Sequence, residues 1–386
     1  MNFLVCRFIK NYQDTKDADV RTSVGKLSGI VGIFSNLFLF VIKFVIGTIV
    51  HSVSIQADGV NNLTDAGSNI ISILSFHFAN KPADKDHPFG HERTETIASL
   101  FVGILILVLG FETAKESISK VIHPGSIDFR IASVSILLIS IIVKFWMYTY
   151  NKKLSKTYDS SLLEATALDS ISDVCGTAAV LVSTLLSPVL HFNLDGYMGI
   201  VVSGIIIYGA YGLLRDMINS LIGEAPDPEL VHNIVDRIMA HPAILGVHDM
   251  MLHNYGPNKI FASAHVEVDS SKDIFETHDH IDNIEREVKE NMNIDLVLHM
   301  DPVKVNDPET ELYRAKVVKA IHQIDPKWGF HDFRIVSGPT HVNLVFDLVI
   351  PFEEKYTQEE IEEMLLKHIE SDKKIYLVLT IDHPYA

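Results

Sequence analysis

Six long apolar stretches dominate the first 223 residues of the chain. Each is about 20 residues or longer, which is the length of an α-helix that crosses the hydrocarbon core of a bilayer. Polar residues interrupt the second and fifth stretches, so we expect these two helices to lie inside a bundle, screened by the other four. The predicted spans lie near residues 27–50, 54–79, 94–117, 129–150, 161–186 and 196–221.

After residue 223 the pattern changes to short amphipathic helices and alternating strands. The predicted elements are helix 229–238, strands 246–254 and 260–268, helix 274–290 and strand 295–302. The same α-β-β-α-β order recurs about 82 residues later, which indicates an internal repeat. This order is typical of a small two-layer ferredoxin-like sandwich.

The predicted fold class is therefore a membrane α-helical bundle of six transmembrane helices, followed by cytosolic α+β ferredoxin-like domains. We place the transmembrane domain, with a basic cytosolic N-terminal arm, at residues 1–223. The first cytosolic domain is predicted at 224–302 and the second repeat at 303–386. The sequence does not indicate a role for the second repeat.

Charge divides the chain in the same way. Residues 224–386 contain 31 acidic and 15 basic residues and account for nearly all of the net charge of −17. Such acidity argues against nucleic-acid binding, which needs a basic surface. Basic residues of the first half gather in the N-terminal arm and in the loops after the second and fourth spans. This predicts a multi-pass protein of the cell (plasma) membrane with both termini in the cytoplasm.

Other common classes find little support in the sequence. The first 26 residues are mostly polar and lack the apolar core of a cleavable signal peptide. There is no Walker A lysine loop and no glycine-rich nucleotide turn, so we expect no nucleotide partner and no ATP-driven pump. No nucleophile–base arrangement stands out, and we do not expect an enzyme.

The most informative polar residues lie within the second and fifth spans. Asn61 and Asp65 are four residues apart, and so are Asp169 and Asp173. Positions i and i+4 share one face of a helix, so each span carries an oxygen-rich stripe at membrane depth. A charge there costs about 3 kcal/mol on insertion scales and needs a counter-charge. A bound cation is the simplest partner, and a metal-free hydrogen-bond network between the helices is the alternative.

Two further observations bear on this interpretation. No basic residue lies beside either pair in the sequence. We interpret Lys43 and Lys144 as side chains that snorkel to the membrane surface, with a functional role as the alternative. Four oxygen ligands without an imidazole form a hard site that suits Mn²⁺, whereas Zn²⁺ prefers His or Cys. Affinity alone would still rank Zn²⁺ above Mn²⁺, so selectivity must come from geometry and cellular availability.

The loop after the second span holds a second candidate site. Asp84, His87 and His91 offer a carboxylate and two imidazoles within eight residues. Such a set can bind a metal ion at the surface. The alternative is a polar loop whose histidines cap the following helix.

A third candidate site lies in the first cytosolic domain. His248, His265 and His299 fall on three predicted strands, which can bring them to one face of a sheet. Asp301 follows as a ligand or as a group that orients a ligating histidine. His278 or His280, on the predicted helix, is a further candidate ligand.

The second repeat retains only part of this pattern. His331 and Asp382 occupy the positions of His248 and Asp301. Asp347 and Thr380 stand where the first copy has histidines. We therefore interpret the second repeat mainly as a structural or dimer-contact module.

Four segments together resemble the cation diffusion facilitator family of transporters. They are DGVNNLTD at 58–65, PADKDHPFGHER at 82–93, ALDSISD at 167–173 and EAPDPE at 224–229. The resemblance runs from about residue 26 to 302. It implies a homodimeric antiporter that exports divalent metal from the cytosol against an inward flow of protons.

The resemblance also implies roles for the candidate residues. The family's transport site takes two positions from span two and two from span five, which match Asn61, Asp65, Asp169 and Asp173. Zinc transporters of the family usually have a His in this quartet, so its absence resembles the manganese-exporting branch. The loop set resembles a secondary site, and the cytosolic histidines with Asp301 resemble sites at the dimer interface.

The resulting hypothesis is proton-coupled efflux of divalent metal, with Mn²⁺ as the first choice and protons as the counter-ion. Export of Zn²⁺, Fe²⁺ or Co²⁺ by the same architecture is an alternative. A membrane-anchored metal receptor without transport and a passive channel are further alternatives. The expected partners are a second copy of the chain and the lipid bilayer.

Overall fold

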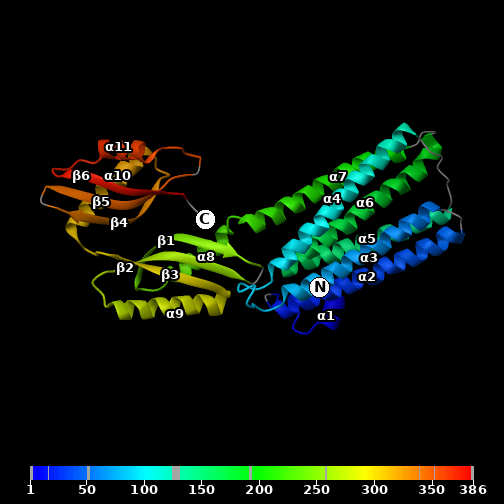
Figure 1. The fold of residues 1–386 in the computed structure, drawn as a ribbon, viewed down its shortest axis with the longest axis horizontal. Helices are drawn as coiled ribbons and strands as arrows, with labels where there is room; N and C mark the ends of the chain where they lie inside the picture. The colour runs from blue at the N-terminus through cyan, green and yellow to red at the C-terminus, as the bar shows by residue number, and fades with distance from the viewer. Residues whose placement is uncertain are drawn as a thin grey trace. The chain divides into compact units, whose positions relative to one another are not determined.

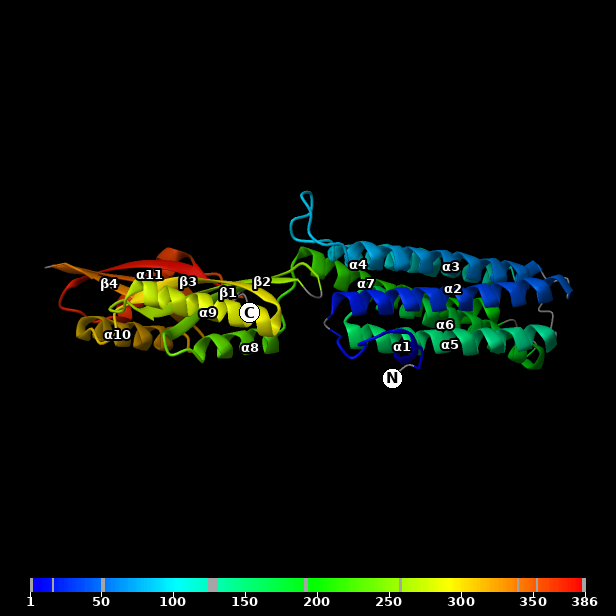
Figure 2. The ribbon, with the colours of Figure 1, turned by 90° about the horizontal axis from the view of Figure 1, so that it is seen from below.

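The computed structural model describes residues 3–15, 17–49, 53–123, 131–190, 194–256, 259–338, 340–351 and 353–383. The chain divides into two compact units. The first comprises residues 1–224 with the short segment 255–258, and the second comprises residues 225–254 and 259–386. Figures 1 and 2 show the helices of the first unit and the mixed helices and strands of the second.

Long, roughly parallel or antiparallel helices form the first unit (Figure 2). A short helix α1 (Phe3–Phe8) precedes them. The others are α2 (Ala18–Ile49), α3 (Val53–Ala79), α4 (Arg93–Ile122), α5 (Ile131–Tyr158), α6 (Ser161–Leu190) and α7 (Asp195–Ile222). The main packing pairs are α2 with α3, α4 with α7, and α5 with α6.

Among the described residues, five helices are long and apolar enough to cross a membrane: α2, α4, α5, α6 and α7. The helix α3 is not among them, because its polar residues lower its hydrophobicity. It nevertheless packs along α2 as a member of the same bundle. The expected polar character of this segment is thus visible in the folded protein.

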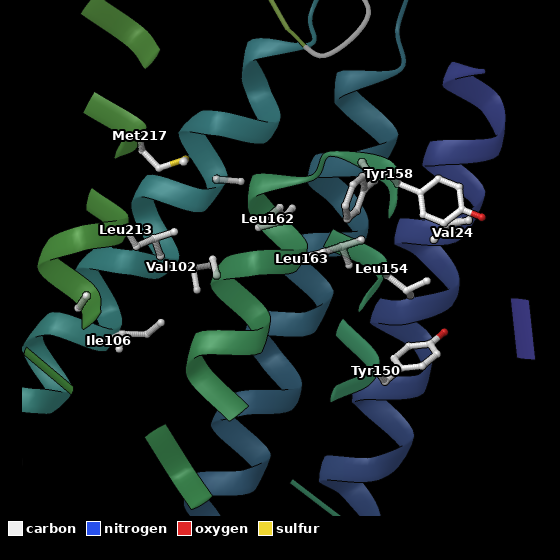
Figure 3. Close-up of a cluster of buried hydrophobic side chains, with 14 of the residues drawn as sticks. Val24, Val102, Ile106, Tyr150, Leu154, Tyr158, Leu162, Leu163, Leu213 and Met217 are labelled. Carbon is white, nitrogen blue, oxygen red and sulfur yellow. The ribbon is translucent and has the colours of Figure 1, made fainter. Parts of the chain in front are cut away.

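Apolar side chains from several helices meet in the bundle core. Figure 3 shows Val102 and Ile106 of α4 near Leu213 of α7 and Leu162 of α6. Small residues bring α4 and α7 close together: a Cβ placed on Gly199 would lie 2.1 Å from Ser117 Oγ. This agrees with the role of small residues in tight helix packing within lipid.

The second unit contains the same succession of elements twice. The first copy has α8 (Pro228–Met239), β1 (Ile244–Asn254), β2 (Ile260–Asp269), α9 (Ile274–Met292) and β3 (Ile294–Val303). The second has α10 (Pro308–Ile324), β4 (Gly329–Ser337), β5 (His341–Val349), α11 (Gln358–His368) and β6 (Lys374–Asp382). The α-β-β-α-β order predicted from the sequence is therefore found in both copies.

Each copy builds one three-stranded sheet. The strand orders are β1-β2-β3 and β4-β5-β6, with the first pair antiparallel and the second pair parallel in each sheet. The alternating burial of β2 and β5 directs their apolar residues into two separate cores. Polar caps fix the helix starts: Asp273 accepts from two N–H groups of α9, and Thr357 and Glu360 form a capping box on α11.

Candidate metal centres

The aspartates of the two semi-polar helices converge in the first unit. Asp65 lies on α3, while Asp169 and Asp173 lie about one turn apart on α6. One carboxylate oxygen from each lies within 4.8 Å of the other two. Bonds between hard cations and oxygen are about 2.0–2.6 Å long, so one divalent ion could contact all three carboxylates.

A lysine supplies the counter-charge to this cluster, which corrects the expectation that Lys144 snorkels. Only 3% of the Lys144 side chain is exposed; its Nζ lies 2.7 Å from Asp65 Oδ2 and also forms an ion pair with Asp173. Lys144 lies midway along α5, roughly 20 Å from either end of the helix, which is farther than a lysine side chain extends. The same expectation fails for Lys43, whose buried Nζ lies 2.8 Å from Asp58 Oδ2.

The fourth predicted ligand, Asn61, lies on the exposed face of α3. Its neighbour Asn62 is buried and donates from Nδ2 to Asp65 Oδ2 at 3.4 Å. Consecutive helical residues are rotated by about 100°, so the two asparagines point in different directions. A ligand role for Asn61 stays a prediction. Sequence reasoning missed Asn62, although its i,i+3 spacing from Asp65 is a recognisable signal.

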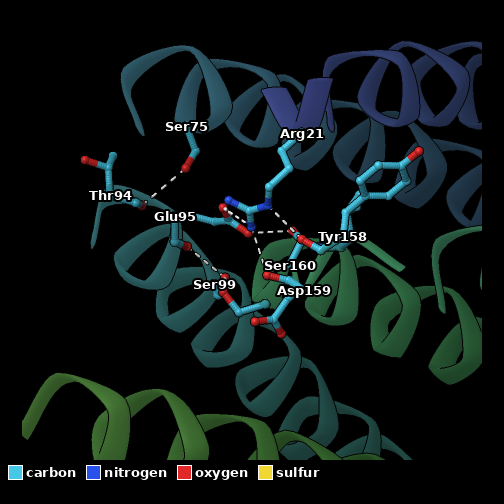
Figure 4. A network of polar contacts seen from close by, with 10 residues as sticks. Arg21, Ser75, Thr94, Glu95, Ser99, Tyr158, Asp159 and Ser160 are labelled. Carbon is cyan, nitrogen blue, oxygen red and sulfur yellow. Dashed lines mark hydrogen bonds and ion pairs between the residues drawn. The ribbon is translucent and has the colours of Figure 1, made fainter. Parts of the chain in front are cut away.

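Another buried ion pair lies elsewhere in the bundle (Figure 4). Arg21 of α2 and Glu95 of α4 approach to 3.5 Å, with 9% and 5% of their side chains exposed. Arg21 also donates to the carbonyl oxygens of Tyr158 and Asp159 at 2.7 and 2.8 Å. Ser160 donates from Oγ to Glu95 Oε1 at 2.5 Å. This network joins α2 and α4 to the segment between α5 and α6.

The predicted loop site is gathered in space. Oxygens of Asp84 lie 3.5 Å from His87 Nδ1 and 3.4 Å from His91 Nε2. The backbone N–H of His87 donates to Asp84 Oδ1 at 2.8 Å, and this hydrogen bond lowers the pKa of the Asp84 carboxyl. The N-cap position of α4 belongs to Glu92, so neither histidine occupies it. The arrangement can bind a divalent ion, and its occupancy stays a prediction.

The strands of the first repeat bring its predicted ligands together. His265 is the register partner of both His248 and His299. Asp301 lies among them: its Oδ2 is 2.8 Å from His265 Nδ1 and 3.4 Å from His248 Nε2, and its Oδ1 is 3.5 Å from His299 Nε2. From this central position the Asp301 carboxylate can act either as a metal ligand or as a group that orients the imidazoles.

His278 stands apart from this cluster in the described structure. It lies on α9 with an exposed side chain, and its Nδ1 is 3.7 Å from Asp282 Oδ1. Within one chain, the histidines of the strands and His278 therefore do not form one group. A metal role for His278 stays a prediction.

Comparisons with known proteins identify the family. The model of the cation efflux transmembrane domain matches residues 29–222, and that of the cation efflux protein cytoplasmic domain matches residues 226–303. An uncharacterized transporter of Methanocaldococcus jannaschii is 32% identical over 250 residues, which cover 65% of this chain and 88% of that protein.

Two further relatives carry functional names. The manganese efflux system protein MneS of Bacillus subtilis is 30% identical over 288 residues, which cover 72% of this chain and 96% of that protein. The cation-efflux pump FieF of Pectobacterium carotovorum is 26% identical over 270 residues, which cover 69% and 89%. Together with the two domain matches, these similarities show that the chain belongs to the cation efflux, or cation diffusion facilitator, family of transporters.

Proposed function

We propose that this protein exports divalent metal ions, Mn²⁺ first among them, from the cytosol in exchange for protons. The observation that carries the proposal is the convergence of Asp65, Asp169 and Asp173 from two helices of an efflux-family bundle. The similarity to manganese efflux proteins of Bacillus subtilis supports the choice of metal. Other relatives are named only as cation-efflux pumps, so Zn²⁺, Fe²⁺ and Co²⁺ remain alternatives.

The charges of the cluster favour a divalent cargo. With all groups ionised, three carboxylates and Lys144 leave a net charge of −2. One divalent ion neutralises this charge, and so do two protons. Either species removes the cost of an unbalanced charge inside the membrane. The cluster can therefore exchange one metal ion for two protons between neutral states.

The proposed cycle follows from this balance. A metal ion enters from the cytosol and exchanges part of its water shell for carboxylate oxygens. Lys144 keeps the carboxylates from repelling one another before the metal arrives and retreats from them when it binds. The bundle then opens outward, and incoming protons compete for the carboxylates and release the metal. Metal at the cytosolic histidines would favour one arrangement of a homodimer and bias the cycle.

The remaining topology belongs to the same proposal. We infer that α3 spans the membrane as a sixth helix, shielded by the more apolar helices around it. Both termini then face the cytosol, and the protein acts in the cell membrane. We also propose domain boundaries at 223/224 and 302/303 and a ferredoxin-like fold for each cytosolic repeat. His278 would join a cytosolic site only from a second copy of the chain.

Transport into proteoliposomes with an imposed pH gradient tests the function. We expect Mn²⁺ flux in the wild type that rises with the proton gradient. Asp65→Asn and Asp173→Asn should each reduce the flux by at least about tenfold, equivalent to about 1.4 kcal/mol. Glu112→Gln, an exposed carboxylate on α4, is the control and should retain the flux.

The alternatives give different results in the same assay. A receptor without transport binds Mn²⁺ but shows no flux. A passive channel shows flux that is indifferent to pH. If both aspartate variants retain wild-type flux, the assignment of the transport site is wrong.

A further inference from the structure

The two repeats of the second unit meet through equivalent residues. His248 of β1 and His331 of β4 hold the same position in their repeats, and their rings stack at 4.4 Å between centroids with an angle of 23°. Contact of a residue with its own counterpart is characteristic of a two-fold relation. The second repeat thus contacts the first through the same position of its own sheet.

The backbone after each histidine is specialised in the same way. Asp249 and Asp332 have φ angles of 49° and 50°, in the left-handed region that non-glycine residues rarely adopt. Both follow a histidine at a place where the strand register shifts. This turn allows the aspartate of one repeat to reach the other: Asp249 Oδ1 lies 3.1 Å from His331 Nε2.

A ligand set results at this boundary. Asp249 of the first repeat meets His331 and Asp382 of the second, with one ligand atom of each within 4.8 Å of the others. His331 Nε2 lies 3.9 Å from Asp382 Oδ2. Beside them, His248 has only 8% of its side chain exposed, and its Nε2 lies 3.4 Å from Asp301 Oδ2 without forming a hydrogen bond within the described structure.

Negative charge is in excess around this boundary. The carboxylate of Asp382 interacts with those of Asp249 and Asp347, and the imidazoles of His331 and His383 only partly oppose their charge. A bound cation would reduce the repulsion among these carboxylates.

We propose that Asp249, His331 and Asp382 form a divalent transition-metal site that fastens the second repeat to the first. One imidazole with two carboxylates suits Mn²⁺, Fe²⁺ or Zn²⁺, whereas Mg²⁺ and Ca²⁺ prefer oxygen ligands alone. The site is separate from the transport cluster and differs from the set of His265, His299 and Asp301. Two of its three ligands lie beyond residue 303, where the family match ends.

Equilibrium dialysis of the full-length protein in detergent, with Mn²⁺ as the probe, tests the proposal. His331→Gln and Asp382→Asn should each bind about one Mn²⁺ fewer per chain than the wild type. His368→Gln removes an exposed histidine of α11 in the same repeat and should bind as the wild type does. Size-exclusion profiles show whether each variant is folded. If His331→Gln does not fold, the Mn²⁺ stoichiometry of Asp382→Asn alone tests the site.

Limited proteolysis tests whether the metal holds the two repeats together. Mn²⁺ should protect the segment 304–307 between the repeats from limited proteolysis in the wild type and in His368→Gln, but not in Asp382→Asn. Unchanged Mn²⁺ stoichiometry in both site variants, or an equal loss in His368→Gln, would overturn the proposal. Asp65→Asn serves as a further reference: it should lose transport and keep the protection, which separates this site from the proposed transport function.

Discussion

Two buried clusters of charge lie within the same helical unit, and they are built on different principles. In the first, Arg21 faces Glu95, so that one cation meets one anion. Carbonyl oxygens and the Ser160 hydroxyl add hydrogen bonds to both members. In the second, Lys144 faces three carboxylates, among them Asp65 and Asp173.

The difference separates a structural ion pair from the proposed site for the transported metal. A balanced, hydrogen-bonded pair in a low-dielectric environment has nothing to gain from a further ion. A cluster with surplus negative charge is stable only when it acquires cations, and it can exchange one cation for another. Burial of a charged side chain thus does not by itself indicate a binding role. The net charge that remains after ion pairing is the more informative quantity.

The largest expected effect is on the balanced pair. Glu95→Gln leaves the Arg21 guanidinium buried without a counter-charge, which should destabilise the protein by about 3–5 kcal/mol. Thermal unfolding in detergent measures this loss. Asp65→Asn should unfold close to the wild type, because it relieves repulsion among the carboxylates. An equal loss of thermal stability in Glu95→Gln and Asp65→Asn would contradict the distinction between the two clusters.

The next prediction concerns the fixed positive charge of the cargo cluster. In Lys144→Gln the neutral metal-free cluster holds three protons instead of two. All three must leave if Mn²⁺ is to contact the three carboxylates, so Mn²⁺ binding should displace about one more proton than in the wild type and leave a net charge of −1. Affinity should then change by about tenfold more per pH unit, or about 1.4 kcal/mol. Calorimetry in buffers of different ionisation enthalpy counts the protons.

A matched lysine provides the control for that experiment. Lys43→Gln removes a buried lysine that pairs with Asp58 instead of the three aspartates. It should leave the number of displaced protons unchanged. If Mn²⁺ displaced the same number of protons in the wild type and in Lys144→Gln, the lysine charge would not be what keeps a third proton off the carboxylates.

Within the balanced pair, Ser160→Ala should have a smaller effect on stability than Glu95→Gln. Ser160→Ala removes the hydroxyl that donates to Glu95 Oε1 at 2.5 Å. Loss of one hydrogen bond to a buried carboxylate should cost about 1–3 kcal/mol at most and should not alter Mn²⁺ flux. Thermal unfolding and transport measured on the same preparation check both parts. A flux defect with normal stability would assign this network to the transport cycle.

The smallest effect is expected for metal preference. Asn61→His adds the imidazole that Zn²⁺ favours and should shift the Zn²⁺/Mn²⁺ transport ratio about threefold or more toward Zn²⁺. Asn62→His alters the neighbouring residue that contacts Asp65 in this structure. Comparison of the two variants in the same competition assay identifies the asparagine that faces the ion. A shift with Asn62→His alone would exclude Asn61 as the ligand.

Much of the architecture could be predicted from the sequence, because it depends on local patterns. Hydrophobic length marked the helices, although α2 begins at Ala18, nine residues before the predicted span. Alternation and spacing revealed the two repeats of the second unit. The i,i+4 pairs placed Asp169 and Asp173 on one face of α6, as the structure shows.

Contacts between distant elements were decided only by the tertiary structure. The sequence could not show that Lys144 contacts Asp65, 79 residues away on another helix, or that Asp249 meets His331 across two repeats. Helix rotation also decided which asparagine, Asn61 or Asn62, lies near the carboxylates. Periodicity fixes which residues share a face of an element, whereas charge neutralisation depends on which faces pack together, and packing is a property of the whole fold.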